Sequence, residues 1–364
     1  MVYKKSSDET LALLDKLISL PSVSREETAT ADAISLFLRN KGIAHNRLFN
    51  NVWALNRDYD PAKPTLMLNS HHDTVKPSPA YTDNPFTPIH RDGRIYGLGS
   101  NDAGASVVSL IETFCSYYDV DLPFNLLLAI TAEEEVMGEH GMRALLPELE
   151  RRNINVSMAV VGEPTGMNAA VGERGLVVLD CTAHGKSGHA AREEGVNAIY
   201  AAIKDIDRLR SFRFEKESQL LGPIKITVTQ IAAGTQHNVI PDECRFVVDV
   251  RTTDAYTNEQ TVELLRDAID SDAVPRSTRI RASAIDDSHP LVRAAVALGR
   301  KTFVSPTTSD MALMAEFPSL KMGVGESARS HTAGEYILEQ ELEEGLELYH
   351  RYIAQLAKEL NQKQ

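Results

Sequence analysis

Residues 125–135 read NLLLAITAEEE, and this stretch decides the predicted fold. A short apolar run bounded by turn signals is typical of a buried strand. The run ends in Glu133, Glu134 and Glu135, at the place where an open α/β sheet presents ligands and catalytic groups. Three adjacent carboxylates repel one another unless a cation is bound or protons are shared. The alternative is a solvated acidic helix start, which the helix dipole favours, and only partners elsewhere in the chain decide between the two.

A second apolar segment, TLMLNS, is followed directly by His71, His72 and Asp73. Side chains alternate along a strand, so His71 and Asp73 share one face while His72 points to the other. We therefore predict that His71 is a metal ligand whose imidazole is oriented by Asp73. His72 is the alternative ligand, although Asp73 would then lie on the wrong face to assist it. A polar surface cluster at a strand end is the non-functional alternative.

The remaining candidates lie in three separate segments. Asp102 follows a glycine-rich turn at a predicted helix entry, where an Asp serves as an N-cap or as a bridge between metal ions. Glu163 follows the apolar strand SMAVVG, and His331 lies in a polar loop ahead of the final predicted helix. Because three apolar strands end in a carboxylate or an imidazole, we expect a common site at the carboxyl edge of one sheet.

These side chains suit two Zn²⁺ ions that keep open coordination positions. Histidine ligands favour Zn²⁺, Co²⁺ or Mn²⁺ over Mg²⁺ and Ca²⁺, which prefer oxygen ligands throughout. The predicted ligands form two pairs and one bridge: His71 with Glu163, Glu135 with His331, and Asp102 between them. Glu134 would then be the general base that takes a proton from water and delivers it to the leaving nitrogen, which is hydrolysis of an amide.

Composition narrows the function classes. The chain has 364 residues, 43% of them hydrophobic and 24% charged, which gives room for two to three globular domains. A net charge of −13 argues against nucleic-acid binding, and no apolar run approaches the ~20 residues that span a bilayer. The N-terminal segment MVYKKSSDET lacks the apolar stretch of a signal peptide. The scattered Cys115, Cys181 and Cys244 indicate reduced thiols in a cytoplasmic protein.

The sequence pattern changes near Gly175. From there the predicted elements follow the order β-α-β-β-α-β, with the last strand in TRIRASAI (278–285), which is the layout of a ferredoxin-like domain. An α/β pattern resumes after residue 284. We therefore predict one catalytic domain formed by residues 1–174 and 285–364, interrupted by an inserted domain at 175–284.

Seven motifs carry a family resemblance: HHDTV, GLGSNDAG, TAEEEVMG, GEPTG, GKSGHAA, HNVIPD and SHTAGEY. Together they resemble the co-catalytic zinc amidohydrolase and metallopeptidase family that includes acetylornithine deacetylase, succinyl-diaminopimelate desuccinylase, carboxypeptidase G-type enzymes and aminoacylase. The resemblance covers nearly the whole chain. It implies a zinc-peptidase-like α/β catalytic domain with a mixed sheet flanked by helices, and the metal ligands and base named above. It also implies that the insert is a lid through which the protein forms a homodimer.

The resemblance assigns further residues by position. His189 matches a histidine that reaches the site of the partner subunit and helps to hold the oxyanion. Residues near the substrate carboxylate in relatives match Arg174, Asn238, Arg251 and Thr308. Some relatives have a cis peptide after the bridging Asp, here Asp102–Ala103. The chain departs from the family pattern at His72, at Lys76 and at Glu133.

The segments around His331 and Arg174 resemble acetylornithine deacetylases more than desuccinylases. They imply hydrolysis of the small molecule N-acetyl-L-ornithine, or of another N-acyl-L-ornithine, in arginine biosynthesis. The alternatives on the same fold are succinyl-diaminopimelate, N-acetyl-lysine or a small peptide as substrate. A catalytically silent binding protein is the alternative from a different class. Such a protein should have lost a ligand or the base, and all of them are present.

Overall fold

We describe the protein from a computed structural model, which covers residues 3–192 and 194–361; the first two residues of the segment inspected for a signal peptide lie outside this range. The chain divides into two compact units, Met1–Val171 with Ile285–Phe303 and Ser309–Gln364, and Gly172–Ala284 with Val304–Thr308. The first boundary falls three residues before the predicted one, and the segment 304–308 was not predicted to join the insert. The division follows strand pairing, because β16 (Thr302–Ser305) pairs with β8 (Ala169–Glu173), whose last two residues belong to the second unit.

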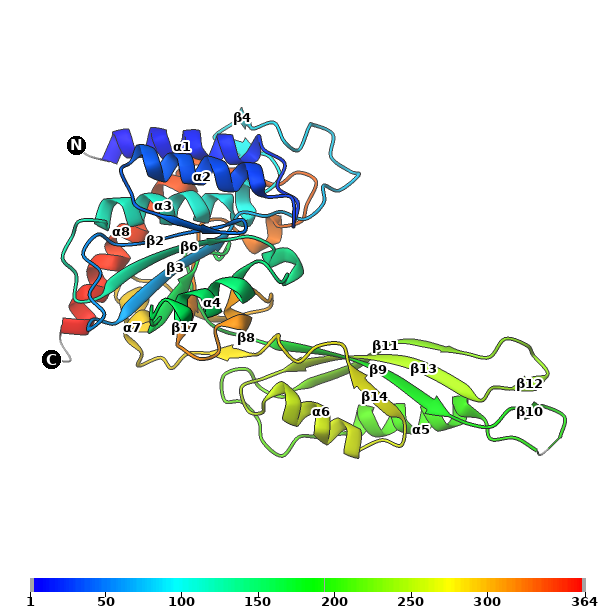
Figure 1. The fold of residues 1–364 in the computed structure, drawn as a ribbon. Helices are drawn as coiled ribbons and strands as arrows, with labels where there is room; N and C mark the ends of the chain where they lie inside the picture. The colour runs from blue at the N-terminus through cyan, green and yellow to red at the C-terminus, as the bar shows by residue number, and fades with distance from the viewer. Residues whose placement is uncertain (1–2, 193, 362–364) are drawn as a thin grey trace. The chain divides into compact units, whose positions relative to one another are not determined.

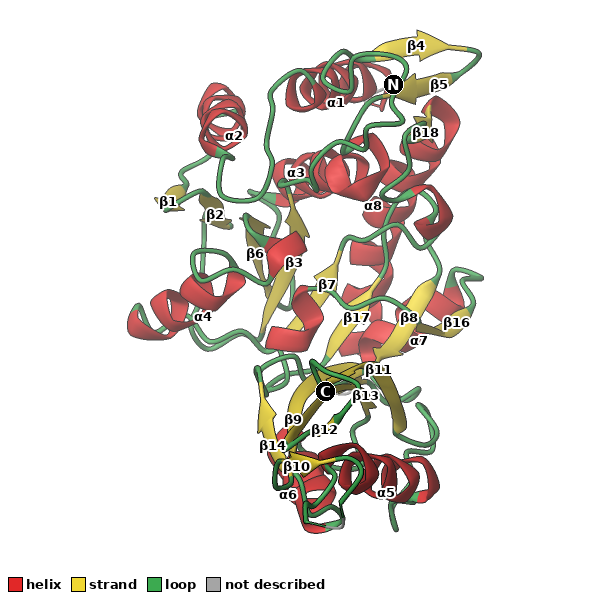
Figure 2. Ribbon diagram, turned by 90° about the vertical axis from the view of Figure 1, so that its right-hand side faces the viewer, coloured by secondary structure: helices red, strands yellow, loops and turns green. Residues whose placement is uncertain are grey.

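The first unit is built on a mixed sheet, as predicted (Figure 2). Its strands lie in the order β1-β2-β6-β3-β7-β17-β8. The central neighbours β6, β3, β7 and β17 are parallel, while β2 and β8 run antiparallel to their neighbours. The bounds of the strands not yet given are β1 Asn46–Leu48, β2 Asn51–Leu55, β3 Thr65–His71, β6 Asn125–Thr131, β7 Met158–Val161 and β17 Ser319–Lys321.

Helices cover both faces of this sheet (Figure 1). Alternate side chains of β3 point to opposite faces and pack against the helices there. Leu66 and Leu68 point into a core cluster with α1, α2, α3, α7 and α8, whereas Met67 packs against α4 on the other face. β3 and β6 are buried along their whole length, so adjacent apolar residues, Leu66–Leu68 in β3 and Leu126–Ile130 in β6, replace the alternation of a half-exposed strand. The helices span Tyr3–Ile18 (α1), Thr28–Asn40 (α2), Ala105–Tyr117 (α3), Met142–Arg151 (α4), Pro290–Ala297 (α7) and Glu339–Asn361 (α8).

Short elements complete the first unit. A small sheet has the order β18-β5-β4. A π-helical turn, η1, precedes α3, and a 3₁₀ turn, η2, follows β6. Their bounds are β4 Ile89–Arg91, β5 Arg94–Tyr96, β18 Tyr336–Leu338, η1 Ser100–Gly104, η2 Glu134–Val136, η3 Asp310–Leu313 and η4 Ser327–Arg329.

The second unit has the predicted β-α-β-β-α-β order, in an antiparallel sheet β11-β13-β9-β14. Alternate side chains of β9 and β13 form a buried cluster with α5 and α6. An additional two-stranded ladder joins β10 and β12. The bounds are β9 Gly175–His184, β10 Gly188–His189, α5 Ala198–Ser211, β11 Lys225–Ala233, β12 Val239–Ile240, β13 Glu243–Thr252, α6 Asn258–Asp267 and β14 Asp272–Pro275.

The last strand of the second unit was predicted in the wrong place. It is β14, and within the segment 278–285 only β15 (Ser283–Ala284) is a strand. The Asn258 side chain donates hydrogen bonds to the carbonyl oxygens of Thr278 (2.9 Å) and Ile280 (2.8 Å). These bonds hold the backbone in a loop, and a period-two pattern of side chains does not reveal them.

Two further predictions are consistent with the described residues. Cys115, Cys181 and Cys244 are free thiols, and the last two are buried. Among residues 3–192 and 194–361, no helix combines the length and apolar character needed to cross a membrane.

Candidate metal centre

Three strand ends meet at one edge of the first unit's sheet, as the sequence predicted. β6 and β7 flank β3, and both pair with it in parallel. The register places His71 opposite Thr131, so the acidic triplet leaves β6 directly beside the end of β3. Glu163 follows the end of β7 two residues after Val161. Parallel pairing therefore brings together groups that lie about 30 to 90 residues apart in the chain.

All five predicted ligands lie together. His71 Nε2 lies 3.3 Å from Asp102 Oδ1 and 3.7 Å from Glu163 Oε1. His331 Nε2 lies 3.1 Å from Glu135 Oε1 and 3.5 Å from Asp102 Oδ2. The two oxygens of Asp102 thus face one histidine each, which is the arrangement required of a bridging carboxylate.

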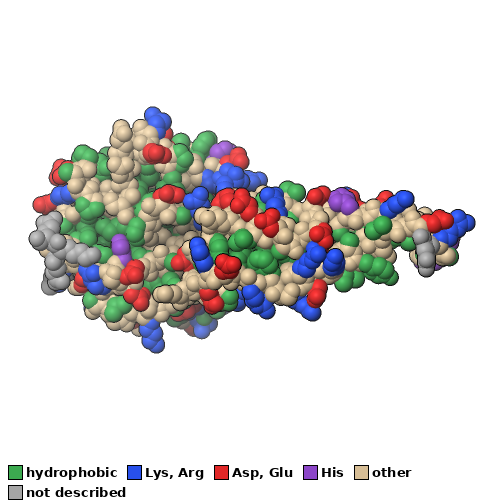
Figure 3. Space-filling model, turned by 90° about the horizontal axis from the view of Figure 1, so that it is seen from below, with side chains coloured by type: hydrophobic (Ala, Val, Ile, Leu, Met, Phe, Trp, Pro, Cys, Tyr) green, Lys and Arg blue, Asp and Glu red, His purple; other side chains and the backbone are tan. Residues whose placement is uncertain are grey.

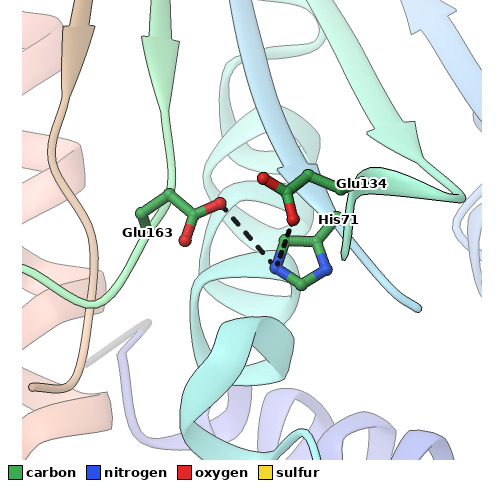
Figure 4. A group of neighbouring side chains, drawn as sticks. All are labelled: His71, Glu134 and Glu163. Carbon is green, nitrogen blue, oxygen red and sulfur yellow. Dashed lines mark ion pairs between the residues drawn. The ribbon is translucent and has the colours of Figure 1, made fainter. Parts of the chain in front are cut away.

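Glu134 also lies against this group of side chains. Its Oε2 is 3.9 Å from His71 Nε2, on the same side of the imidazole as Glu163 (Figure 4). Two groups of three residues could each hold an ion, because within each group the ligand atoms lie within 4.8 Å of one another. The first group is His71, Glu134 and Glu163, and the second is His71, Asp102 and Glu135. Since Glu134 belongs to the first set, its assignment as a base rather than a ligand stays a prediction.

The electrostatics of these side chains fit a divalent cation. Burial raises the pKa of Glu163 to about 8, and the charges of Asp102 and Glu135 act in the same direction against His71. Burial likewise raises the pKa of Glu134 well above its ordinary value, despite the neighbouring His71. Glu163 Oε1 is buried and accepts no hydrogen bond from any described residue. A cation would supply the partner that this oxygen lacks and would offset the repulsion among the carboxylates.

Asp73 connects His71 to the acidic turn. His71 Nδ1 donates to the backbone oxygen of Asp73 at 3.0 Å, and Asp73 Oδ1 lies 3.4 Å from the same nitrogen. Because the carbonyl only accepts, a neutral imidazole carries its proton on Nδ1 and keeps Nε2 for ligation. The Asp73 carboxylate also accepts from the backbone N–H groups of Glu134 (3.1 Å) and Glu135 (3.2 Å) and from the Ser24 hydroxyl (2.7 Å).

His72 is separated from the metal site by strand alternation, so the alternative ligand is wrong. Its Nε2 donates to the Asn50 carbonyl oxygen at 2.9 Å, and its Nδ1 lies 2.8 Å from the Thr30 hydroxyl. Burial lowers the pKa of His72 to about 4. A neutral ring with its proton on Nε2 satisfies the Asn50 contact, and its Nδ1 and the Glu27 carbonyl oxygen (2.9 Å from the Thr30 hydroxyl) are the two acceptors that face the single hydrogen of that hydroxyl.

Asp102 lies in an irregular segment held by a residue that the sequence analysis did not single out. The Asp102–Ala103 peptide is cis, as the family resemblance implied. Glu335, which is buried, accepts from the backbone N–H groups of Asn101 and Asp102, both at 2.9 Å. Glu335 belongs to the motif SHTAGEY, so its position beside His331 was the available signal.

Comparison with known proteins identifies the family. Residues 67–355 match the family described as Peptidase family M20/M25/M40. The chain belongs to this family. Among curated M20 relatives, it is 24% identical to succinyl-diaminopimelate desuccinylase of Delftia acidovorans over 96% of this chain and 98% of the relative. It is 30% identical to the enzyme of the same name from Wolbachia pipientis wMel, over 70% of this chain and 66% of that relative.

Solved M20 structures share the fold. Aminopeptidase PepT of Bacillus cereus superposes with a TM-score of 0.77 at 21% identity, covering 96% of this chain and 99% of that chain. The Bacillus subtilis YXEP protein, described as a dinuclear metal binding peptidase from the M20 family, has a TM-score of 0.73 at 20% identity, covering 97% and 98%.

The other predicted site residues of this M20 chain belong to the second unit, which we describe by itself. His189 and Asn238 lie together, because β10 pairs with β12 and the Ala190 N–H donates to the backbone carbonyl oxygen of Asn238. The Arg174 guanidinium donates to the carbonyl oxygens of Leu221 and Pro223. Arg251 makes a bidentate pair with Asp249, at 2.8 and 3.1 Å.

Both arginines are thus occupied by groups of the second unit. Thr308 is half-buried in the segment 304–308. The substrate roles of Arg174, Asn238, Arg251 and Thr308, and the oxyanion role of His189, stay predictions.

Proposed function

We propose that this protein is a two-metal amidohydrolase that cleaves the amide bond of an N-acyl diamino acid. The observation that carries the proposal is the convergence of the buried His71, the exposed His331 and three carboxylates, Asp102, Glu135 and Glu163, at one place, with Glu134 beside them. The Bacillus subtilis relative is a dinuclear metal binding peptidase, which supports two ions over one in this chain as well.

Each residue has a distinct part in the proposed reaction. Zinc ions, with cobalt or manganese as substitutes, would be held by His71, Asp102, Glu135, Glu163 and His331 and would polarise the substrate carbonyl. Glu134 takes a proton from the attacking water and returns it to the leaving nitrogen. Asp73 keeps Glu134 in place through the backbone and holds the His71 Nδ1 proton, which leaves Nε2 as the nitrogen that would bind the metal. His189 of a partner subunit would stabilise the oxyanion.

The named relatives favour a succinyl substrate. Both curated enzymes described above are succinyl-diaminopimelate desuccinylases, and one of them aligns along nearly the whole chain. N-Succinyl-L,L-diaminopimelate, an alternative in the sequence analysis, therefore replaces acetylornithine as the first candidate, and lysine biosynthesis replaces arginine biosynthesis. N-Acyl-L-ornithine remains the second candidate, because of the sequence around His331 and Arg174.

We further propose that the protein is a cytoplasmic homodimer formed through the second unit. β11 is an edge strand whose unpaired backbone groups are available for another strand. Apolar side chains are exposed there and on α5, including Ile231 (55%), Tyr200 (72%) and Ile203 (53%). On the face drawn in Figure 3, hydrophobic side chains of the second unit lie at the surface among charged ones. Sedimentation of the wild type and of Ile231→Lys tests this proposal, and a monomeric wild type would refute it.

The substrate is tested by kcat/KM of the zinc-loaded protein. The panel holds N-succinyl-L,L-diaminopimelate, N-succinyl-L-ornithine, N-acetyl-L-ornithine, N-acetyl-L-lysine and dipeptides. A preference of about a hundredfold for one of them corresponds to about 2.7 kcal/mol of transition-state discrimination and identifies the acyl group and the amino acid. No turnover of any member by a protein with both ions bound would favour the silent binding protein.

A further inference from the structure

Glu27 is a buried carboxylate that the proposed mechanism does not use. It lies at the residue before α2 and is fully inaccessible to solvent. Its Oε1 accepts from the backbone N–H groups of Arg25 (2.5 Å) and Glu133 (3.3 Å), and its Oε2 accepts from the Asn50 side chain (3.0 Å). Glu27 thus joins the start of α2, the β1–β2 turn and the acidic turn after β6.

The acidic turn needs such a support because Glu133 has a left-handed backbone, with φ 56° and ψ 21°. This conformation is unfavourable for a residue with a side chain, and it persists only where surrounding contacts determine it. The Glu133 carbonyl accepts from the Gly138 N–H at 2.9 Å, and its carboxylate accepts from the His140 N–H at 3.2 Å. Its own N–H is held by Glu27.

Two carboxylates together hold three consecutive backbone N–H groups. Glu27 accepts from Glu133, and Asp73 accepts from Glu134 and Glu135. The direction of a side chain follows from the orientation of its own peptide units. A rotation at Glu133 would therefore move both Glu134 and Glu135 relative to His71.

Asn50 ties this support to β3. Its side-chain nitrogen donates to Glu27, and its backbone oxygen accepts from His72 Nε2, next to His71. Its side-chain oxygen accepts from Arg47 Nη2 at 2.9 Å, which fixes the orientation of the amide. Asn50 thus anchors His72, which follows the ligand His71, directly. It anchors Glu133, which precedes the proposed base Glu134, through Glu27.

We propose that Glu27 is a positioning residue that sets the geometry of Glu134 and Glu135 through the N–H of Glu133. The inference rests on the proposed amidohydrolase function for its effect on turnover, and it extends that function to a group outside the metal site. Loss of Glu27 should lower kcat and leave KM nearly unchanged, because substrate contacts are not removed.

Complementary variants at two positions test the inference. Both oxygens of the Glu27 carboxylate accept from N–H donors, whereas the amide in Glu27→Gln has only one oxygen. Its NH₂ group must therefore face another donor, either the Asn50 side-chain nitrogen or the N–H groups of Arg25 and Glu133. Asn50→Asp alone places a carboxylate oxygen against Glu27. The double variant Glu27→Gln/Asn50→Asp pairs a donor with an acceptor again and leaves the Gln oxygen for Glu133. Asn56→Asp is the matched control, because Asn56, like Asn50, is partly buried, and its side-chain oxygen accepts from the Leu126 N–H (2.9 Å) near the opposite end of β6, a bond that an aspartate oxygen can also accept.

Two measurements are made on each zinc-loaded variant: kcat and KM on the best substrate, and hydrogen exchange of the peptide that covers residues 133–136. We expect Glu27→Gln to lower kcat by about 10- to 100-fold, the range typical of groups that orient a metal site, with KM within about threefold and faster exchange in the turn. The double variant should recover most of the lost kcat and of the lost protection from exchange, and Asn56→Asp should change neither quantity.

Unchanged kcat and exchange in Glu27→Gln would overturn the inference, as would a loss that the double variant does not recover. If the wild type turns over no substrate, the proposed function fails, and exchange in the turn decides the role of Glu27 without it.

Discussion

Replacing Asp73 with Asn removes charge and one acceptor while preserving size. Asp73 is fully buried and serves four donors: Ser24, His71, Glu134 and Glu135. Burial alone would raise the pKa of Asp73, but the hydrogen bond and charge of His71 and the bond from Ser24 hold that pKa below its usual value. The native site therefore contains the ionised form, which Asn does not reproduce.

The loss of unfolding free energy follows from the two orientations that the side-chain amide introduced by Asp73→Asn can take. With nitrogen in place of Oδ1, the amide opposes the Glu134 N–H and His71 Nδ1. With nitrogen in place of Oδ2, it opposes the Glu135 N–H, while the Ser24 hydroxyl can rotate to accept. The second orientation costs less and forfeits one hydrogen bond to a charged acceptor, about 1.5–3 kcal/mol of unfolding free energy.

Activity should fall by a similar amount. A lost orienting group at a metal site typically costs about 10- to 100-fold in activity or metal affinity, which is about 1.4–2.7 kcal/mol. The assay is kcat/KM at saturating Zn²⁺, with urea unfolding and zinc titration of the same preparation. A variant within about threefold of wild-type kcat/KM at full metal loading would refute the role that we derive for Asp73.

Four further results are expected. Glu134→Gln should retain zinc in a titration yet lose about 10²- to 10⁴-fold in kcat, and a variant of undiminished kcat would disprove proton transfer by Glu134. Chelation should abolish turnover, and added Zn²⁺ or Co²⁺ should restore it. Phe114→Ala, in the core, should lower the unfolding free energy by about 3–5 kcal/mol in urea. Burial would lower the pKa of His90, but Asp15 and Glu339 raise it, so the stability that His90 contributes is present below about pH 6.5 and disappears as pH rises through the raised pKa. The stability difference between wild type and His90→Gln should therefore be larger at about pH 5.5 than at about pH 9.

The sheet and the candidate metal ligands at its edge could be predicted from the sequence, because neighbouring parallel strands end on the same side of a sheet. The strands β3, β6 and β7 are buried throughout and have apolar centres, and each ends in or is followed by side chains that can ligate a metal. Adjacent parallel strands end at the same edge, so order along the chain was sufficient to group His71, Glu135 and Glu163. Strand alternation also separated His71 from His72.

Loop conformation and long-range hydrogen bonds were not predictable in the same way. The loop at 278–285 is held by Asn258, about 20 residues away, and its side-chain alternation resembles a strand. Glu27 precedes the start of a helix, where an acidic residue is ordinarily explained by the helix dipole. Its contact with Glu133 spans 106 positions and depends on a left-handed residue that no composition or periodicity reveals.

Hydrogen bonding separates two kinds of carboxylate in this site. Asp73 and Glu27 each accept from several N–H or O–H groups. Despite burial, His71 and Ser24 hold the pKa of Asp73 below its usual value, whereas the hydrogen bonds to Glu27 only partly offset the burial that raises its pKa. Glu163 Oε1 is buried and receives no such donor from the described residues. Burying an uncompensated carboxylate is costly, whereas a carboxylate that accepts several bonds gains little from a cation. Glu163, whose Oε1 is left short of donors, is therefore the carboxylate best suited to a cation, and Asp73 and Glu27 hold the backbone of the turn that carries Glu134 and Glu135.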